Sequence, residues 1–375
     1  MQYKEYELGE LLPFEQPTAY IVKSTDYNDS YSTPVLTAGK TFILGKTNEE
    51  DGIFDQLPVI IFDDFTTATQ FVNFKFKVKS SAMKILHINT DLVIPKYIFY
   101  RLQIIQFDHS THKRYWIQSY SKIKVSIPSL DEQSRIVSRI DELFSELDKA
   151  VDTLKTTKEQ LAVYRQVILV DAFKEALGSP YFEIEQMCDK IVDCPHSTPK
   201  WTEYGELCLR TTNFKRGYLD LQVPNYVSKE AFDERNRRIT PSPGDVLYSR
   251  EGSILGIACI IPEGINPCLG QRMMLLRTKD TLNNRYLMHY LNSPTVTNHV
   301  IATKGGTGSP HINVGDIKAF PIPVPEIDIQ EKIVNDLEEK LSVCDGVEKT
   351  VDAALAQADA MRQSILKQAF EEGIV

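Results

Sequence analysis

The sequence lacks the features that would place the chain in a membrane or outside the cell. No apolar run approaches the roughly 18 consecutive residues that span a bilayer. The opening residues, MQYKEYELGE, show no charged-then-apolar export pattern. The six cysteines form no C-x-x-C pair, so we expect reduced structural thiols rather than a disulfide framework. These absences predict a cytoplasmic protein.

Metal-site and catalytic motifs are also missing. Cys194 and His196 have the chemistry of metal ligands, but no second pair follows at a finger-like spacing, so we expect no metal site. TAGKT (37–41) is similar to the end of a phosphate-binding loop, yet Pro34 stands where such a loop needs a glycine. The sequence contains no G-x-S-x-G, no H-E-x-x-H and no N/D-P-P-Y/F for holding a flipped base. We therefore expect neither catalysis nor a cofactor on this chain.

The length and composition predict more than one folded core. At 375 residues the chain is too long for a single ordinary core, and 42% apolar residues supply enough material for two. Short β-rich runs, such as 57–62 and 244–249, alternate with helical pieces, such as 97–105 and 285–292. The fold class that we expect is α/β (α+β), with two mixed globules.

A repeat dominates the organisation of the chain. IPSLDEQSRIV begins at Ile127, and IPVPEIDIQEKIV begins at Ile322. From Gln133 and Gln330 onward, the two copies run in register at an offset of 197 for about forty residues. The identical residues near the far end are Arg165, Gln166, Ile168, Leu169, Ala172 and Phe173 in the first copy and Arg362, Gln363, Ile365, Leu366, Ala369 and Phe370 in the second. Identity at both ends indicates a duplicated unit.

Both copies carry the heptad pattern of a long helix. In the first copy the seam consists of Ile136, Ile140, Leu143, Leu147, Ala150, Leu154, Leu161, Tyr164 and Ile168. In the second copy it consists of Ile333, Leu337, Cys344, Val347, Val351, Ala354, Ala358, Met361 and Ile365. The simplest partner for each apolar stripe is the other stripe, in an antiparallel coiled coil with pseudo-two-fold symmetry. The alternative is two separate helices, each packed on its own core.

The order along the chain is therefore globule, helix, globule, helix. We expect one globular domain at 1–128 and a helix at 129–178, followed by a second globular domain at 179–323 and a second helix at 324–375. The prolines before each helix and Gly178-Ser179-Pro180 after the first one mark these boundaries. Such a molecule is a spacer that carries two globules.

The charge distribution permits a nucleic-acid partner but does not demand one. Most of the net charge of −9 lies on the two predicted helices, so each globule is close to neutral. Basic clusters occur at 75–84, 111–116, 235–238 and 304–311, although a charged run is more often a solvated surface. Neutral globules on acidic helices predict weak DNA binding by the isolated chain, so we expect partners to supply part of the DNA clamp.

The whole chain resembles the specificity subunit of type I DNA restriction-modification systems. The resemblance is carried by the I-P-x-x entry and R-Q-x-I-L-x-x-A-F end of each helix, and by CPHSTPKW (194–201), LRTTNF (209–214) and LGQRMMLLR (269–277). It implies two target-recognition domains that each read half of an interrupted, asymmetric DNA site, with the helices setting the gap. It also implies two methyltransferase subunits that bind S-adenosylmethionine, and restriction subunits that bind ATP and Mg²⁺, as partners.

Direct readout of bases needs Arg or Lys against guanine and Asn or Gln against adenine. The DNA-binding candidates in the second globule are Lys200, Arg210, Asn213, Arg250, Gln271 and Arg272. Arg250 has an alternative role, because it can pair with Glu251 or another acid. The basic side chains can equally contact phosphate.

The candidates in the first globule are Lys40, Thr66, Thr67, Thr69 and Ser81, which lie in turn-like polar runs. Threonine can contact phosphate or the thymine methyl group, but FTTAT (65–69) can also be β-strand packing. Lys113, Arg114, Lys304 and His311 flank the loops that lead into the helices, and we expect them to contact phosphates. The rival hypothesis for the whole chain is a coiled-coil adaptor for proteins without a DNA role.

Overall fold

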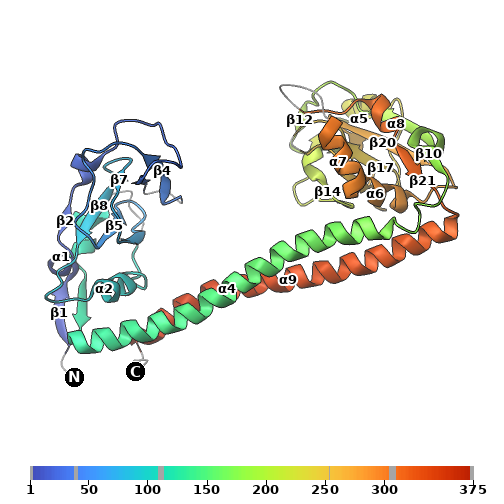
Figure 1. Cartoon of the computed structure of the whole chain (residues 1–375). Helices are drawn as coiled ribbons and strands as arrows, with labels where there is room; N and C mark the ends of the chain where they lie inside the picture. Colours follow the sequence, from blue (N-terminus) through green and yellow to red (C-terminus); the bar gives the residue numbers. More distant parts are fainter. Residues whose placement is uncertain (1–2, 38–40, 109–113, 253, 304–309, 372–375) are drawn as a thin grey trace. The chain divides into compact units, whose positions relative to one another are not determined.

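The computed structural model describes residues 3–37, 41–108, 114–252, 254–303 and 310–371 (Figure 1). The chain divides into two compact units, Met1–Leu154 with Ala353–Val375, and Lys155–Asp352. Each unit contains one globule and parts of the two long helices, α4 (Leu130–Ala172) and α9 (Ile327–Glu371). The four domain boundaries set from the sequence stay predictions.

The globule of the first unit is built on a four-stranded antiparallel sheet in the order β2-β8-β5-β6, beside a three-stranded sheet β4-β3-β7 and a pair β1-β9. Its strands are β1 (Lys4–Glu7), β2 (Phe14–Glu15), β3 (Thr33–Leu36), β4 (Ile43–Thr47), β5 (Val59–Asp63), β6 (Thr69–Val72), β7 (Lys77–Val78), β8 (Met83–His87) and β9 (Lys124–Ile127). Its helices are α1 (Leu8–Leu11), α2 (Pro95–Leu102) and α3 (Tyr115–Gln118), with 3₁₀ turns at Pro17–Tyr20 and Tyr120–Lys122.

Strand β5 lies at the centre of this globule because both of its faces are apolar. Ile60 and Phe62 point into the core that contains α1, α2 and α3, whereas Val59 and Ile61 point into a second core on the other face. Successive side chains of a strand point to opposite faces, so a continuous apolar run fills two cores at once. The first core also receives Ile136 and Ile140 from the start of α4.

The globule of the second unit follows the same plan, with a four-stranded sheet β11-β20-β17-β18 beside a second sheet β12-β16-β13-β19 and the pairs β10-β21 and β14-β15. Its strands are β10 (Tyr181–Glu183), β11 (Cys188–Asp193), β12 (Trp201–Thr202), β13 (Glu206–Leu209), β14 (Phe214–Lys215), β15 (Tyr218–Leu219), β16 (Tyr226–Val227), β17 (Val246–Ser249), β18 (Ala258–Ile260), β19 (Cys268–Leu269), β20 (Met273–Thr278) and β21 (Pro321–Pro323). Its helices are α5 (Lys229–Arg235), α6 (Asn284–Asn292), α7 (Pro294–Thr303) and α8 (Val314–Lys318), with 3₁₀ turns at Ile184–Met187 and Thr211–Asn213. Val246 and Tyr248 of β17 point into the core under α6, and Leu247 points into the opposite core.

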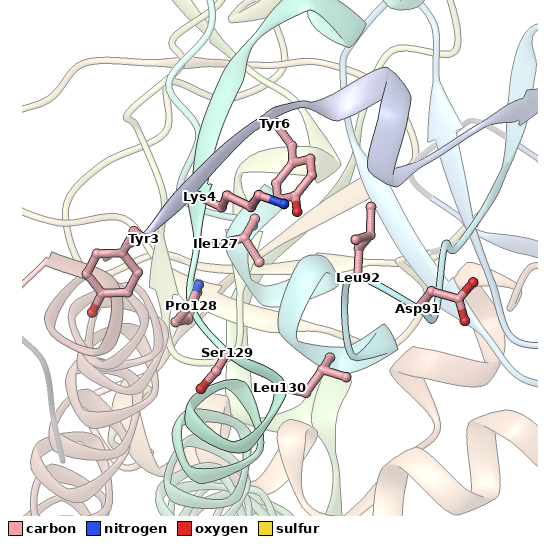
Figure 2. Close-up of a pocket in the computed structure, with 9 residues that line it drawn as sticks. All are labelled: Tyr3, Lys4, Tyr6, Asp91, Leu92, Ile127, Pro128, Ser129 and Leu130. Atoms are coloured by element: carbon pink, nitrogen blue, oxygen red, sulfur yellow. The ribbon is translucent and has the colours of Figure 1, made fainter. Parts of the chain in front are cut away.

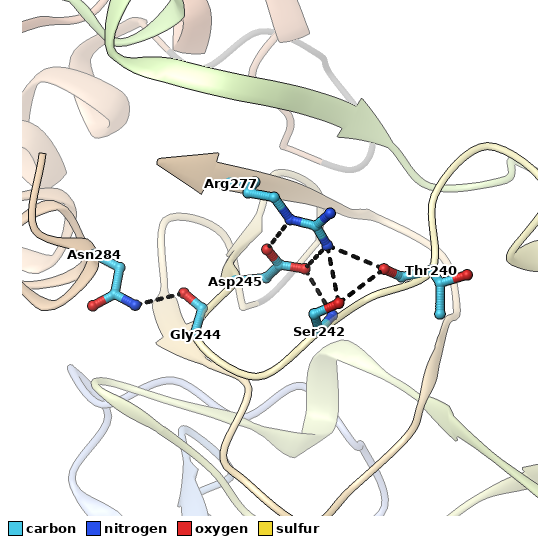
Figure 3. A network of polar contacts seen from close by, with 6 residues as sticks. All are labelled: Thr240, Ser242, Gly244, Asp245, Arg277 and Asn284. Carbon is cyan, nitrogen blue, oxygen red and sulfur yellow. Dashed lines mark hydrogen bonds and ion pairs between the residues drawn. The ribbon is translucent and has the colours of Figure 1, made fainter. Parts of the chain in front are cut away.

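A polar network holds the turn that leads into β17 (Figure 3). Arg277 on β20 donates from Nε and Nη2 to the two carboxylate oxygens of Asp245, both at 2.7 Å, and its Nη2 also donates to the Thr240 carbonyl. Asn284, the first residue of α6, donates to the carbonyl of Gly244 at 2.9 Å. Gly244 has φ +87° and a Cβ there would meet the Asn284 amide at 2.9 Å, so glycine suits the turn for two reasons.

The long helices pack against each other antiparallel within each unit. In the first unit, Leu366 and Ala369 of α9 share a core with Ile136 and Ile140 of α4. In the second unit, Ile168 and Leu169 of α4 share one with Leu337, Leu341 and Cys344 of α9. The start of one helix thus lies beside the end of the other in both units, which confirms the antiparallel pairing and rules out the alternative of two separate helix cores.

The same ion pair occurs once in each unit. Arg165 of α4 binds Asp345 of α9 at 2.7 Å in the second unit, and Arg362 of α9 binds Asp148 of α4 in the first. The offset of 197 relates Arg165 to Arg362 and Asp148 to Asp345. Each helix therefore supplies the arginine of one ion pair and the aspartate of the other, as pseudo-two-fold symmetry requires.

The predicted heptad seam is wrong in detail. Tyr164, Val347 and Met361 were placed in the seam, but they are 54%, 39% and 46% exposed. Leu169 and Leu366 are buried instead. A straight helix has 3.6 residues per turn, so a strict seven-residue register drifts around its surface over a long helix.

Each globule also contacts the end of one long helix. The Phe173 ring, directly after α4, packs on Tyr286 of α6 with centroids 5.2 Å apart. Its repeat counterpart Phe370, near the end of α9, packs on Tyr97 of α2 at 5.3 Å. All six cysteines are buried free thiols, and none of the described helices is long and apolar enough to cross a membrane.

Candidate nucleic-acid interface

Three segments of the first globule meet where β5 ends. Asp64, the residue after β5, accepts at its carbonyl a hydrogen bond from Tyr115 N at 3.0 Å and donates from its own N–H to the Ala82 carbonyl at 3.3 Å. Its carboxylate accepts from Trp116 N at 2.9 Å. These bonds bring residues 64–68, 80–82 and 114–116 together, and we call this surface the β5 edge.

The β5 edge gathers four of the predicted DNA-binding residues. Thr66, Ser81 and Arg114 are exposed there, and Thr67 is half-buried with φ +58° at the tip of the turn. Thr69 is different: it is buried in β6 and its hydroxyl accepts a hydrogen bond from Gln103 Nε2 at 2.5 Å. The alternative of β-strand packing therefore describes Thr69, whereas Thr66 and Ser81 are exposed.

A buried ion pair supports this edge from below. Lys84 of β8 lies 3.3 Å from the Asp64 carboxylate, and neither side chain is more than 2% exposed. A pair that is buried this deeply holds its geometry, because separating the charges leaves each without compensation. The ion pair thus fixes Asp64, the residue from which the turn with Thr66 and Thr67 begins.

Four segments of the second globule meet in the equivalent place, where β17 ends. Arg250, the residue after β17, donates from its N–H to the Arg272 carbonyl and accepts at its carbonyl from Ile312 N, both at 3.0 Å. Cys194 N donates to the Met273 carbonyl at 3.1 Å. These bonds bring residues 193–197, 250–252, 270–273 and 310–312 together, and we call this surface the β17 edge.

Among the described residues, Arg272, Arg210 and Lys200 are exposed cations at or next to the β17 edge. Gly270 N donates to the Leu209 carbonyl, which places Arg210 next to the edge. The Arg210 guanidinium lies 5.1 Å from the centroid of the Trp201 ring, which is 36% exposed. A cation over an aromatic face is held in place while its N–H groups remain available.

Two other candidates in this globule are engaged within the fold. Arg250 is only 8% exposed and binds Asp193 through Nε and Nη2 at 2.8 and 3.0 Å, and Glu251 through Nη1 at 2.8 Å. Asn213 is buried, accepts from Arg210 N at 2.8 Å and donates to the Asp220 carbonyl at 3.0 Å. The structure thus has the acid pairing that the sequence left open for Arg250, and the DNA contacts of both residues stay predictions.

The remaining candidates differ in what surrounds them. Gln271 is half-buried and its Nε2 donates to the His196 carbonyl at 2.7 Å. His311 is half-buried and its backbone pairs with that of Glu251. Lys40, Lys113 and Lys304 lie outside the described residues.

Sequence reasoning missed two features of this surface. Phe65 in the β5 turn is 49% exposed, and the only signal in the sequence was that an aromatic residue opens the polar run FTTAT. Arg235 belongs to the basic cluster 235–238, but it is buried and donates to the carbonyls of Leu269, Gly270 and Ser197 at 3.0, 3.1 and 2.6 Å. It therefore holds the loop that presents Gln271, a role that a charge cluster in a sequence does not reveal.

The chemistry of both edges is that of binding. Burial raises the pKa of the Cys194 thiol and outweighs the opposite effect of the hydrogen bond that its sulfur accepts from Met273 N, so the thiol stays protonated. Among the described residues, no three His, Cys, Asp or Glu side chains are placed to hold a metal ion. What the edges offer is exposed Arg, Lys, Thr and Ser groups on loops that buried hydrogen bonds fix, which suits contacts with phosphates and base edges.

Comparison with known proteins gives a consistent picture. The family model of the type I restriction modification DNA specificity domain matches residues 2–161 and 182–356. The specificity subunit of the type I restriction enzyme EcoR124I/EcoR124II of Escherichia coli is 31% identical over 371 residues, which covers 95% of this chain and 92% of that protein.

Two solved structures share the fold. A chain from a study of complex assembly and conformational transition of the type I R-M system superposes with a TM-score of 0.70 at 18% identity, over 99% of this chain and 98% of that one. The crystal structure of the HsdS subunit from Thermoanaerobacter tengcongensis gives 0.52 at 17% identity, over 99% and 97%.

Proposed function

Because this chain belongs to the family of type I restriction modification DNA specificity proteins, we propose that its two globules read the two halves of one interrupted, asymmetric DNA site. The chain is the non-catalytic DNA specificity subunit of a type I restriction-modification system, and DNA and the other subunits of that system are its partners. Family membership favours this function over a coiled-coil adaptor without a DNA role.

One observation carries the proposal for the two globules. The β5 edge and the β17 edge share one backbone arrangement, although their sequences differ. In each, the residue directly after the central strand, Asp64 or Arg250, accepts a backbone hydrogen bond from a segment further along the chain that precedes a long helix. The exposed groups on that arrangement differ: Thr66, Ser81 and Arg114 on one edge, and Arg210 and Arg272 on the other. A common arrangement with different exposed groups is what two readers of different half-sites require.

The proposal assigns the bases and the phosphates to different residues. Arg210, Gln271 and Arg272 are the first candidates for base contacts in the second globule, since Arg suits guanine and Gln suits adenine. Lys200, Arg114 and His311 are assigned to phosphates, as are Lys40, Lys113 and Lys304. Phosphate contacts set the register of the protein on the duplex and carry no sequence information.

We assign the spacing of the half-sites to the paired helices α4 and α9, and the docking of two methyltransferase subunits to the pseudo-symmetric units. S-adenosylmethionine, ATP and Mg²⁺ are placed on the methyltransferase and restriction subunits, so that this chain needs no cofactor of its own. A cytoplasmic location follows from this proposal, since the DNA partner lies there.

Genome-wide mapping of methyladenine in cells with and without the chain tests the proposed function. We expect one motif to disappear with the chain, and that motif to consist of two unlike half-sites around a gap of fixed length. An unchanged methylation pattern, or the loss of a continuous motif, would contradict the proposal.

A further inference from the structure

The two long helices begin with the same buried contact, although the globules that they follow differ. Gln133 lies in the first turn of α4, and Gln330 lies in the first turn of α9, at the repeat offset of 197. Both glutamines are 0% exposed. A side-chain amide without access to water must find its hydrogen-bond partners inside the protein.

Each amide makes three hydrogen bonds, and the three partners are equivalent in the two units. Gln133 Oε1 accepts from Ile94 N at 2.8 Å, and its Nε2 donates to the carbonyls of Leu92 and Pro128, both at 3.0 Å. Gln330 Oε1 accepts from Asn283 N at 2.8 Å, and its Nε2 donates to the carbonyls of Thr281 and Pro325, at 3.0 and 2.8 Å. We call each set of three bonds a glutamine latch.

The partners show what each latch joins. Ile94 and Asn283 are the N-cap residues of α2 and α6, the helices that pack on the central sheets of the globules. Pro128 and Pro325 each lie two residues before the start of a long helix. One side chain thus ties the globule, the incoming strand and the long helix at a single point.

The same latch occurs in both units, although the segments between its residues differ in length. In the first unit 39 residues separate the glutamine from the N-cap that it binds, whereas in the second unit the separation is 47 residues. The contact is therefore more than a by-product of copied local sequence. It marks a geometry that both halves of the chain have to maintain.

Packing alone leaves these junctions incomplete. Leu92 and Pro128, which accept from Gln133, also line a surface pocket of about 550 Å³ between β1, the loop before α2 and the start of α4 (Figure 2). Thr281 and Pro325, which accept from Gln330, line a pocket of about 780 Å³ in the same place of the second unit. With open space on one side of each junction, the directional hydrogen bonds of the amide carry much of the restraint.

We infer that Gln133 and Gln330 are positioning residues that fix the direction in which each globule leaves its long helix, and thereby the length of the DNA gap that is accepted. This inference rests on the proposed function, and it separates two kinds of specificity. The edges select the bases of the half-sites, and the latches select the spacing between them. Neither glutamine needs to touch DNA.

The test uses the complex of the full chain with its methyltransferase subunits and a DNA library in which both half-sites are constant and the gap varies. Gln133→Leu and Gln330→Leu remove all three hydrogen bonds of each latch. We expect the preference for the natural gap over gaps one base pair shorter or longer to fall by roughly tenfold, about the factor that corresponds to one lost hydrogen-bonded contact. The bases preferred within each half-site should not change.

Matched controls are available on the same helices. Gln166→Leu and Gln363→Leu are the same substitution at exposed positions that are also related by the repeat, and both should keep the wild-type gap preference. If a leucine variant does not fold, Gln133→Met and Gln330→Met keep the length of the unbranched side chain and remove the same hydrogen bonds, so they test the same restraint. Circular dichroism and a melting curve identify the variants that fold.

The outcomes separate the inference from the proposed function. Folded latch variants, leucine or methionine, that keep the wild-type gap preference would overturn the inference, and a loss of melting temperature alone would show a purely structural role. A wild-type complex that methylates without any gap preference would instead contradict the proposed function.

Discussion

Arg250 and Arg272 lie at the same edge of the second globule, but their guanidinium groups have different surroundings. Arg250 is enclosed by Asp193 and Glu251, whereas Arg272 is exposed. Both were candidates from the sequence, because the residue type is what a sequence offers at this point. Which of the two faces solvent depends on β11, which brings Asp193 to Arg250 from 57 residues away.

The exposed position of Arg272 leads to a prediction about DNA binding. Arg272→Ala should weaken binding of the cognate site by about 1 to 3 kcal/mol and relax the preference at one base pair, provided that the side chain reads a guanine. Lys229→Ala, which removes an exposed cation on α5 of the same globule, is the control. Binding measured on a set of single-base variants of the site decides the matter, and an equal loss on all variants would make Arg272 a phosphate contact.

The enclosed position of Arg250 leads to the opposite prediction. Arg250→Ala should lower the free energy of unfolding by about 3 kcal/mol, because the largely buried Asp193 carboxylate loses both of its hydrogen bonds from the guanidinium. Chemical denaturation of the chain measures this, with Arg272→Ala as the variant that should unfold like the wild type. Equal stability of the wild type and Arg250→Ala would mean that the pair does not hold the β17 edge.

At the scale of the elements, the repeat made the long helices and their antiparallel pairing predictable, because apolar stripes on two copies of one segment have few other ways to be buried. The residues in the contact were less predictable. Tyr164 and Met361 follow the seven-residue rule but are exposed, since the actual contact follows the 3.6-residue turn. The site edges could not be assembled from the sequence either, because hydrogen bonds between distant loops build them.

The corrected seam can be tested with two substitutions on α9. Leu366→Ala should cost roughly 3 kcal/mol of stability, since Leu366 is 3% exposed and fills the core with Ile136 and Ile140. Met361→Ala, at a position that is 46% exposed, should cost less than about 1 kcal/mol. Thermal unfolding of both variants tests whether Leu366 or Met361 lies in the helix contact. A larger loss of stability for Met361→Ala would contradict the burial of Leu366.

Helix α6 gives the second unit a dependence on pH. Burial lowers the pKa of His289 to about 4, and the charge of Arg285 adds to the shift, so the neutral ring lies 3.0 Å from the Glu338 carboxylate of α9. The unfolded chain binds this proton near pH 6.5, so the stabilisation is complete above that pH and is lost as the pH falls from about 6.5 towards 4, by up to about 3 kcal/mol. Across this pH range, the melting temperature of the wild type should fall more steeply with falling pH than that of His289→Gln. An equal pH dependence of the two melting temperatures would contradict the role of the histidine.

At the scale of the whole molecule, the duplication joins two DNA-recognition globules and one pair of spacer helices in a single chain. The Arg165–Asp345 and Arg362–Asp148 pairs show that each unit repeats the helix contact of the other. The glutamine latches repeat the attachment of each globule to its helix. The exposed groups at the β5 edge and the β17 edge differ between the halves, as two unlike half-sites require.

The central claim, that paired helices set the distance between two half-sites, is tested most directly by lengthening them. One heptad inserted after Leu154 and one after Asp352, where the two units divide, adds about 10 Å of helix, or about three base pairs of DNA. Sequencing of the DNA methylated by the lengthened complex should show the same two half-sites with a gap longer by about that amount. Changed half-sites around an unchanged gap would contradict the account.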